Sequence, residues 1–398
     1  MNLFEQVTTA PTDPILGLSE AFRNDPNPGK INLSVGVYQD ASGASPVLEC
    51  VRLAAKRLAD SNLTKGYLPI NGAPRFLENT RHLVFGKDNE MVSTGRVASV
   101  HTPGGTGALR IVGDFLRGIL DRRTIWVSNP TWANHQGIFS AAGLEVLSYP
   151  YYQPESHGLN RDGLLTVLEN IPENDCVLFH ACCHNPTGID PTPEDWETIA
   201  KICKARHLLP VIDFAYQGFA SGWIEDALAI RLFAQYGLEF FVCSSFSKNF
   251  GLYQDRVGAL HAVAKNKDEA DRVLSQLKVI VRTNYSNPPA HGSHLVNTIL
   301  DDPELYSIWE EELKAMRARI LSVRHQFVDA LEQAGASTDF SFIRHQTGMF
   351  SFSGLSRDTV LRLRSNNGIY MVDSGRINVA GINDSNLHPL CQAIVAAL

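Results

Sequence analysis

Apolar and polar residues follow two alternating patterns through the first three quarters of the chain. Short runs rich in Val, Ile and Phe predict buried strands. Between them, apolar residues recur every three or four positions, as in Gly107–Leu120 and Pro193–Arg206, which predicts helices. Thr192 stands in the N-cap position of the second helix. Because alternating strands and helices form βαβ units, we expect an α/β fold with a mostly parallel central sheet flanked by helices. The predicted strands are Thr124–Ser128, Leu144–Tyr149, Cys176–Ala181, Leu208–Asp213, Phe240–Ser245 and Val257–Ala264.

The pattern changes at about residue 302, where one apolar stripe begins. The stripe predicts a long helix that ends near Gly335, a typical residue for a helix C-terminus. Its members are Leu305, Trp309, Leu313, Met316, Ile320, Val323, Phe327 and Leu331. Shorter elements follow and predict a smaller α+β domain. They are strands at Phe340–Ile343, Met349–Phe352, Tyr370–Val372 and Ile377–Val379, and helices at Thr359–Asn366 and Leu387–Leu398.

These changes divide the chain into three expected parts. Residues 46–315 form a large domain and residues 316–398 a small C-terminal domain. Residues 1–45 are rich in proline and form an N-terminal arm that we expect to return and pack on the small domain.

Composition and charge exclude several classes of protein. Hydrophobic residues make up 44% of the chain and charged residues 19%, as in ordinary globular proteins. The net charge of −7 and the absence of Lys/Arg blocks disfavour nucleic acid and anionic membranes as partners. Glu5 and Asp13 lie where a signal peptide would carry positive charge, and no apolar run has the length of a membrane span. The seven cysteines are odd in number and lack framework spacing, so we expect a cytoplasmic protein.

Two predicted strands end in residues that could carry chemistry. Lys248 follows Phe240–Ser245, so its amine is delivered to the carboxyl end of a strand, where α/β sheets bind ligands. There a lysine of lowered pKa can form a Schiff base, although most lysines are surface charges. Asp213 ends Leu208–Asp213 and, if buried, needs a cationic partner such as a protonated pyridine nitrogen. Otherwise Asp213 caps a helix.

A glycine-rich turn at residues 102–107 is a candidate anion site. Glycines let the backbone approach a phosphate, and the helix that follows offers free N–H groups and the positive end of its dipole. No Gly-Lys-Ser/Thr follows, and Arg110 occupies the position where a dinucleotide fingerprint requires glycine. The turn therefore binds one phosphate at most, or is only a tight turn. Ser245 and Arg256 could add donors.

One segment and three single residues have both a functional and an ordinary interpretation. The segment from His180 to His184 contains two histidines and two cysteines, but its spacing does not match a metal site, and we expect no metal. Trp132 could pack in the core or stack on a planar cofactor. Arg282 and Arg376 lie outside helical ion-pair patterns; they could be surface charges, or two forks that bind a substrate with two carboxylates.

Taken together, these segments resemble a known family. Ser245-Phe-Ser-Lys248-Asn-Phe-Gly-Leu-Tyr, followed by Arg256-Val-Gly, resembles the cofactor-lysine signature of class I pyridoxal-phosphate-dependent aminotransferases. Other blocks are similar to its aspartate/aromatic amino acid subfamily, in order from Asp13 to Ser374-Gly-Arg376, so the resemblance covers essentially the whole chain. These blocks are Gly104-Gly-Thr-Gly-Ala-Leu, Ser128-Asn-Pro-Thr-Trp132, His184-Asn185-Pro-Thr-Gly188, Asp213-Phe-Ala-Tyr216 and Asn284-Tyr-Ser-Asn-Pro-Pro.

The resemblance implies fold type I and a set of cofactor contacts. Lys248 would carry pyridoxal 5'-phosphate and move the proton at the substrate Cα. Asp213 would pair with the pyridine nitrogen, supported by His135. Tyr216 and Asn185 would bind the phenolic oxygen. Trp132 would stack on the ring, and the phosphate would be held by Gly104, Gly105, Thr106, Ser245 and Arg256, joined by Tyr67 from a neighbouring subunit.

The resemblance also implies a substrate and an assembly. Arg376 would bind the α-carboxylate, helped by Asn185, Trp132 and the backbone near Gly36. Arg282 of the neighbouring subunit would bind the distal carboxylate, in a homodimer with shared active sites. The implied activity moves the amino group between L-aspartate or L-glutamate and a 2-oxo acid by ping-pong kinetics.

Alternative functions stay open. Within the family, the alternative is an aromatic amino acid aminotransferase of dual specificity. Val37, Thr106 and Asn287 fit a preference for dicarboxylates, whereas Gln39, Ser45 and Gly66 fit neither pattern. A β-lyase or decarboxylase would not need Arg282. A nucleotide-dependent dehydrogenase lacks its glycines, and a structural role leaves the strand-end residues unexplained.

Overall fold

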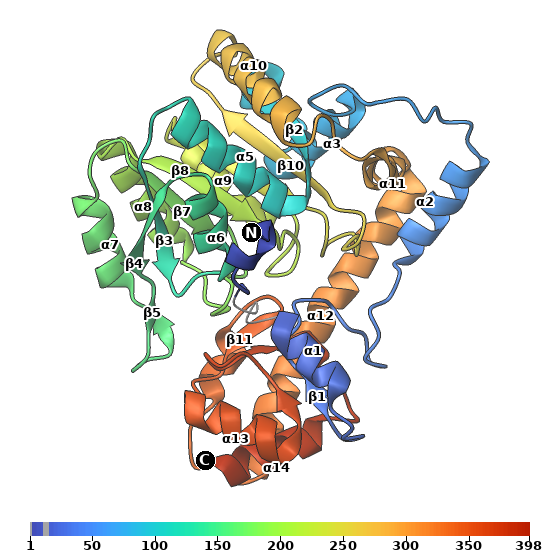
Figure 1. The fold of residues 1–398 in the computed structure, drawn as a ribbon, viewed down its shortest axis with the longest axis vertical. Helices are drawn as coiled ribbons and strands as arrows, with labels where there is room; N and C mark the ends of the chain where they lie inside the picture. The colour runs from blue at the N-terminus through green and yellow to red at the C-terminus, as the bar shows by residue number, and fades with distance from the viewer. Residues whose placement is uncertain (1, 11–15) are drawn as a thin grey trace.

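The computed structural model describes residues 2–10 and 16–398 (Figure 1). Asp13, where the family resemblance begins, lies outside the described residues. The expected α/β fold is confirmed by a seven-stranded sheet in the order β2-β10-β9-β8-β7-β3-β4. Its strands are β2 (Val97–Pro103), β3 (Thr124–Asn129), β4 (Glu145–Pro150), β7 (Cys176–His180), β8 (Leu209–Phe214), β9 (Phe240–Ser245) and β10 (Val257–Val263).

All neighbouring strands of the sheet are parallel except at β10. This strand pairs antiparallel with both β2 and β9. Residues 246–256 alone connect β9 to β10, a connection too short for the helical crossover that parallel pairing needs. Strand β2 was not among the predicted strands, because Ser99, His101 and Thr102 interrupt its apolar run although all three are buried.

Helices cover both faces of the sheet. Side chains of β7 alternate between two apolar cores, with Leu178 in one and Phe179 in the other, so the strand is buried throughout. The larger helices are α2 (Glu49–Asp60), α3 (Pro74–Phe85), α5 (Gly104–Gly118), α6 (Asn134–Ala141), α7 (Arg161–Asn170), α8 (Pro193–Ala205), α9 (Leu228–Gln235), α10 (Lys267–Asn284) and α11 (Ala290–Asp301). Among the described residues, none of the helices is long and apolar enough to cross a bilayer.

Helix α8 begins with the expected Thr192 cap. The Thr192 hydroxyl accepts from the backbone N–H of Asp195, and the Asp195 carboxylate accepts from the backbone N–H of Thr192.

Short elements complete this part of the chain. The short elements are η1 (Leu3–Gln6), α4 (Glu90–Ser93), η2 (Glu225–Ala227), and the paired strands β5 (Tyr152–Gln153) and β6 (Gly158–Leu159).

The predicted long helix is α12 (Pro303–Gln333). All eight residues of its apolar stripe are buried, and Gly335 follows it with a φ of +84°. In Figure 1, α12 runs from the side of α2 and α11 into a smaller lobe that holds α13 (Arg357–Asn367) and α14 (Leu387–Ala397). One rigid element therefore packs against both lobes.

The smaller lobe also contains the N-terminal segment. Helix α1 (Leu16–Asn24) lies in this lobe (Figure 1), and β1 (Ile31–Asn32) pairs in parallel with β12 (Ile369–Tyr370). The Tyr370 hydroxyl donates to Asp25 at 2.9 Å. A second pair, β11 (Phe350–Phe352) and β13 (Arg376–Asn378), is antiparallel, and η4 (Val379–Gly381) follows it.

One predicted strand of the smaller lobe is wrong. Residues Phe340–Ile343 do not form a strand; the turn η3 (Ser341–His345) occupies this region. The Asp339 carboxylate accepts from the Ser341 backbone N–H at 2.7 Å and from its hydroxyl at 3.0 Å, which favours a local turn over a ladder.

Trp309 connects α12 to the loop after β9, and this contact predicts a stability change. Its indole stacks on Phe250 with centroids 4.9 Å apart, and its Nε1 donates to the Asn249 carbonyl at 2.8 Å. Trp309→Phe keeps an aromatic ring but leaves that carbonyl unpaired, so we expect the free energy of unfolding to fall by about 1–3 kcal/mol. Tyr306→Phe, on the same helix, is the control and should cost less than about 0.5 kcal/mol. Equal losses in chemical denaturation would contradict this account.

Candidate functional site

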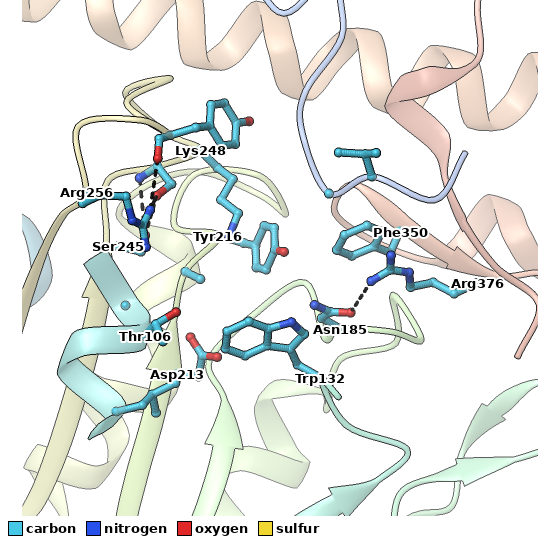
Figure 2. Close-up of a pocket in the computed structure, with 17 residues that line it drawn as sticks. Thr106, Trp132, Asn185, Asp213, Tyr216, Ser245, Lys248, Arg256, Phe350 and Arg376 are labelled. Carbon is cyan, nitrogen blue, oxygen red and sulfur yellow. Dashed lines mark hydrogen bonds between the residues drawn. The ribbon is translucent and has the colours of Figure 1, made fainter. Parts of the chain in front are cut away.

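A cavity of about 310 Å³ opens at the carboxyl ends of the parallel strands (Figure 2). This is the edge of an α/β sheet at which ligands bind. The cavity is lined from both lobes. Its lining residues are Val35, Gly36, Gly105, Thr106, Leu109, Trp132, Asn185, Asp213, Ala215, Tyr216, Ser245, Ser247, Lys248, Tyr253, Arg256, Phe350 and Arg376.

One end of the cavity is built to receive an anion. The positive N-terminus of α5 begins at Gly104, with Gly105 and Thr106 in its first turn. A Cβ on Gly104 would lie 2.5 Å from the Arg256 Nη2, and one on Gly105 would lie 3.2 Å from the Ser245 Cβ. The glycines therefore allow the guanidinium and the hydroxyl to approach the helix N-terminus closely.

Lys248 projects into the middle of the cavity from the loop after β9 (Figure 2). Its Nζ lies 4.5 Å from the centroid of the Tyr216 ring. Burial lowers the pKa of Lys248 to about 8; the charge of Asp213 opposes this shift and that of Arg256 adds to it. About a tenth of the amine is therefore unprotonated at pH 7, far more than for an ordinary lysine, and nucleophilic chemistry requires this unprotonated form.

Asp213 faces the cavity from the end of β8, across from Lys248 (Figure 2). Its carboxylate is 6% exposed and lies 3.1 Å from the His135 Nε2. Burial works against its charge, but His135, His180 and Lys248 outweigh burial and hold the pKa of Asp213 below its usual range. The site therefore holds a fixed negative charge beneath the cavity.

His135 and His180 could be read with Asp213 as metal ligands, since their donor atoms lie within 4.8 Å of one another. Both nitrogens of His135 are already engaged, Nε2 with Asp213 and Nδ1 with the Thr131 hydroxyl at 2.8 Å. Cys182 belongs to a second group, with Cys183 and Asp226. The engaged nitrogens of His135 show that the group of His135, His180 and Asp213 does not fit a metal site.

Tyr216, Asn185 and Trp132 surround the space between Lys248 and Asp213 (Figure 2). Burial keeps the pKa of Tyr216 above its usual range, so its hydroxyl remains a donor. The Trp132 ring is partly exposed on the cavity wall, with its edge against His135. A flat ring placed here would have donors at its side and an aromatic surface on one face.

The end of the cavity opposite α5 carries Arg376 (Figure 2). Its guanidinium is buried and donates to the Ser34 carbonyl at 2.5 Å and the Asn185 Oδ1 at 3.3 Å, while its Nε has no partner among the described residues. Burial lowers the pKa of Arg376 to about 10, so it stays charged at neutral pH. Gly36 lies beside it: a Cβ there would stand 2.9 Å from the Phe350 Cζ.

Four of the predicted site residues do not line this cavity. Gly104 begins α5 directly before the lining residue Gly105, and His135 is hydrogen-bonded to the lining residue Asp213. The other two, Tyr67 and Arg282, lie elsewhere on the chain. Tyr67 is 95% exposed, and Arg282 is exposed in the last turn of α10, where it donates to the Ser286 hydroxyl. The two regions meet, because the Asn287 Nδ2 donates to the Leu68 carbonyl at 3.3 Å. Within one chain they form a separate surface.

Several lining residues were not predicted. Ser247 and Tyr253 fall inside the lysine motif, so the motif itself could have indicated them. The Tyr253 hydroxyl accepts from the Tyr38 backbone N–H at 2.9 Å. Phe350 lies on a predicted strand, but nothing in its apolar pattern separates a site residue from a core residue. The same holds for Val35, Leu109 and Ala215.

Comparison with known proteins gives the family. Residues 28–394 match the model of the aminotransferase class I and II family. The chain is 52% identical to an aspartate aminotransferase of Escherichia coli, with all of both chains covered. It is 47% identical to an aromatic-amino-acid aminotransferase of Pseudomonas aeruginosa, over 99% of this chain and 98% of the relative. A crystal structure of an aromatic-amino-acid aminotransferase from Burkholderia pseudomallei, covalently bound to pyridoxal phosphate, matches with a TM-score of 0.98 and 48% identity over all of both chains. The chain therefore belongs to the class I and II aminotransferases.

Proposed function

We propose that the chain is a pyridoxal-phosphate-dependent transaminase that moves the amino group between L-aspartate or L-glutamate and a 2-oxo acid. One observation carries the proposal: the Lys248 amine and the Asp213 carboxylate face each other across a single cavity (Figure 2). The N-terminus of α5 with Ser245 and Arg256, which we call the anion cradle, closes one end of this cavity, and the buried Arg376 closes the other.

The residues fit pyridoxal phosphate. The close approach of Arg256 and Ser245 to Gly104 and Gly105 suits a phosphate ester at the α5 N-terminus. The buried Asp213 suits a protonated pyridine nitrogen. When bound, the cofactor supplies an electron-withdrawing ring that makes the Cα–H of an amino acid acidic.

The chain's own groups would then manage the proton. Lys248, whose pKa is lowered to about 8, accepts the Cα proton at Nζ and returns it elsewhere on the reacting system. The Tyr216 hydroxyl and the Asn185 amide serve as donors to the phenolic oxygen. The Trp132 ring, which lines the cavity, would stack on one face of the cofactor and exclude water from it.

Arg376 and Arg282 suit a substrate with two carboxylates. Arg376 has an unpartnered Nε and a planar fork for an α-carboxylate, beside the Asn185 amide and the Gly36 backbone. Among the described residues, Arg282 has no carboxylate partner. We propose that it reaches the distal carboxylate in the active site of a second copy of the chain.

A homodimer with shared active sites follows from this proposal. Val279, which is 59% exposed, lies three positions before Arg282 and therefore on the same face of α10. Leu63 and Tyr67 are 46% and 95% exposed on the neighbouring segment. A second copy would cover these side chains and receive Tyr67 at its phosphate.

Two further expectations stand as proposals. We propose that residues 46–315 and 316–398 move as separate units, with the arm of residues 1–45 on the smaller one and small-domain closure over bound substrate. The cytoplasm is the proposed compartment, supported by seven cysteines that are all free.

An aromatic amino acid aminotransferase is the second candidate, supported by the 47% identity to the Pseudomonas aeruginosa relative. Thr106 lines the cavity, and Asn287 holds the segment beside Gly66 through its bond to Leu68. Gln39 and Ser45 belong to the segment that follows Gly36. Relative rates with Asp, Glu, Phe and Tyr discriminate the two candidates.

The first prediction concerns Lys248. The purified protein with pyridoxal phosphate should show a visible absorption band that bleaches with aspartate as oxaloacetate forms. Lys248→Ala should lose the covalent band and reduce turnover by at least roughly 1000-fold, because both the attachment point and the base are removed. Lys265→Ala, outside the cavity, is the control. A Lys248→Ala protein that retains both band and turnover would refute the proposal.

The second prediction concerns Arg282. Arg282→Leu should lower kcat/KM for aspartate by roughly 10- to 100-fold and change that for phenylalanine little, because it removes a charge-assisted contact to the distal carboxylate. Arg272→Leu, also exposed on α10, is the control. Mixing Arg282→Leu with Lys248→Ala protein should restore activity, since a hybrid dimer contains one complete site. Mixtures that remain inactive under conditions of subunit exchange would contradict shared sites.

A further inference from the structure

Arg324 is a charged side chain that is buried inside the smaller lobe and has no role in the site described above. It projects from α12 and is 1% exposed. Among the described residues no carboxylate forms an ion pair with it. Burial lowers the pKa of Arg324 to about 10, so it remains charged at neutral pH. Burying a charge without an ion-pair partner costs free energy, so the hydrogen bonds to the guanidinium must offset that cost.

Within the described part of the chain, the guanidinium of Arg324 donates hydrogen bonds to a single segment. Its Nη2 donates to the Gly348 carbonyl at 2.6 Å and the Phe350 carbonyl at 3.1 Å. Its Nη1 donates to the Ser351 hydroxyl and to the Ile343 carbonyl, the latter at 3.4 Å. The acceptors all lie within residues 343–351, which we call the Phe350 loop. A rigid planar fork with several donors therefore fixes the course of this loop.

The Phe350 loop reaches the cavity through the ring of Phe350 (Figure 2). The Arg376 Cζ lies 4.3 Å from the centroid of this ring. The other sides of the ring face Gly36, where a Cβ would be 2.9 Å away, and Tyr216, at 6.0 Å between centroids. These contacts limit how far the ring can move relative to its backbone, so the bond to the Phe350 carbonyl also helps to set the surface on which the Arg376 guanidinium lies.

The same loop is bonded to the segment that carries Asn185. The Thr347 backbone N–H donates to the Gly188 carbonyl at 2.6 Å, and its hydroxyl donates to Asp190 at 2.6 Å. Asp190 also accepts from the backbone N–H groups of Cys183 at 2.7 Å and His184 at 2.9 Å. Asn185 follows directly and accepts from Arg376. Arg376 is thus contacted by Phe350 and Asn185, whose segments the Phe350 loop joins.

We propose that Arg324 is a positioning residue for substrate binding, which acts through the Phe350 loop to orient the Arg376 guanidinium toward the α-carboxylate. The inference rests on the proposed function, because it takes Arg376 as the carboxylate anchor. This role and a purely structural role predict different effects of substitution. Loss of a residue that only stabilises the fold lowers the stability of the protein and nothing else. Loss of a positioning residue weakens the binding of the substrate carboxylate, while Lys248 and Asp213 keep their geometry.

The experiment compares two arginines that join α12 to the same region. Arg324→Met removes the fork and keeps an unbranched side chain. The control, Arg344→Met, removes an arginine of η3 that pairs with Asp329 at 2.6 Å and Glu332 at 3.3 Å on the outer side of α12. Both are studied as holoenzymes. We expect Arg324→Met to raise KM for aspartate at least about tenfold and to lower kcat less than about threefold.

Two further readouts separate binding from chemistry. The dissociation constant of succinate, a non-reacting dicarboxylate, should rise by the same factor as KM in Arg324→Met. The visible absorption band and its pH titration should match those of the wild type. Arg344→Met should change each quantity less than about twofold.

Milder variants keep the inference testable if Arg324→Met does not fold. Ser351→Ala and Thr347→Val each remove one bond of the Phe350 loop with little change of volume, and each should raise KM and the succinate dissociation constant about two- to threefold. Unchanged values in both variants would overturn the inference. So would an Arg324→Met protein with a lower melting temperature and unchanged KM, or one whose absorption band shifts as well. Failure of the wild type to transfer the amino group would instead overturn the proposed function.

Discussion

A carboxylate held in its charged form at the end of β8 is the constraint on which the site depends. Asp213 is almost inaccessible to water, and burial alone would favour its neutral form. Its hydrogen bond with His135, itself engaged by Thr131, reverses that preference. The fixed charge favours a cation directly above it, which is the condition under which a pyridine ring holds a proton and withdraws electrons.

The sheet register ties this carboxylate to the lysine. Asp213 pairs with Cys243 of the adjacent parallel strand, and Lys248 follows soon after that strand ends. A change of register would turn Asp213 to the other face of the sheet, so the same interactions that bury β8 and β9 also keep acid and amine on one cavity. The anion cradle is added by β2, whose partner β10 approaches so closely that a Cβ on Gly258 would lie 2.5 Å from the Gly104 carbonyl carbon. The smaller lobe then closes the open end with Arg376.

The pattern of apolar and polar residues predicted those elements in which burial alone decides the local structure. Strand β9 was placed at its observed bounds, because a short apolar run of this length is typical of a strand buried on both faces. The stripe of α12 was equally clear. The turn at Ser341–His345 was not, because a single Asp339 side chain outweighs an apolar run that would suit a strand.

The site residues also fall into those that the sequence pattern could predict and those that it could not. Lys248, Asp213 and the glycine turn could be predicted because charge or glycine at a strand end is unusual, and the family motifs then implied their partners. Phe350 and Arg324 could not, since an apolar ring in a strand and an arginine on a helix have ordinary interpretations until the fold brings them together. The roles of Tyr67 and Arg282 stay predictions, because a residue that serves a second copy resembles a surface residue within one chain.

The most direct test of the central claim is the nitrogen NMR shift of the cofactor ring, measured on protein loaded with pyridoxal phosphate labelled with ¹⁵N in the pyridine ring. If Asp213 faces that nitrogen, its resonance should stay at the position of a protonated pyridine from pH 6 to pH 9, because the fixed charge of the carboxylate stabilises the protonated ring. A resonance at the position of a neutral pyridine near pH 7 would contradict the account.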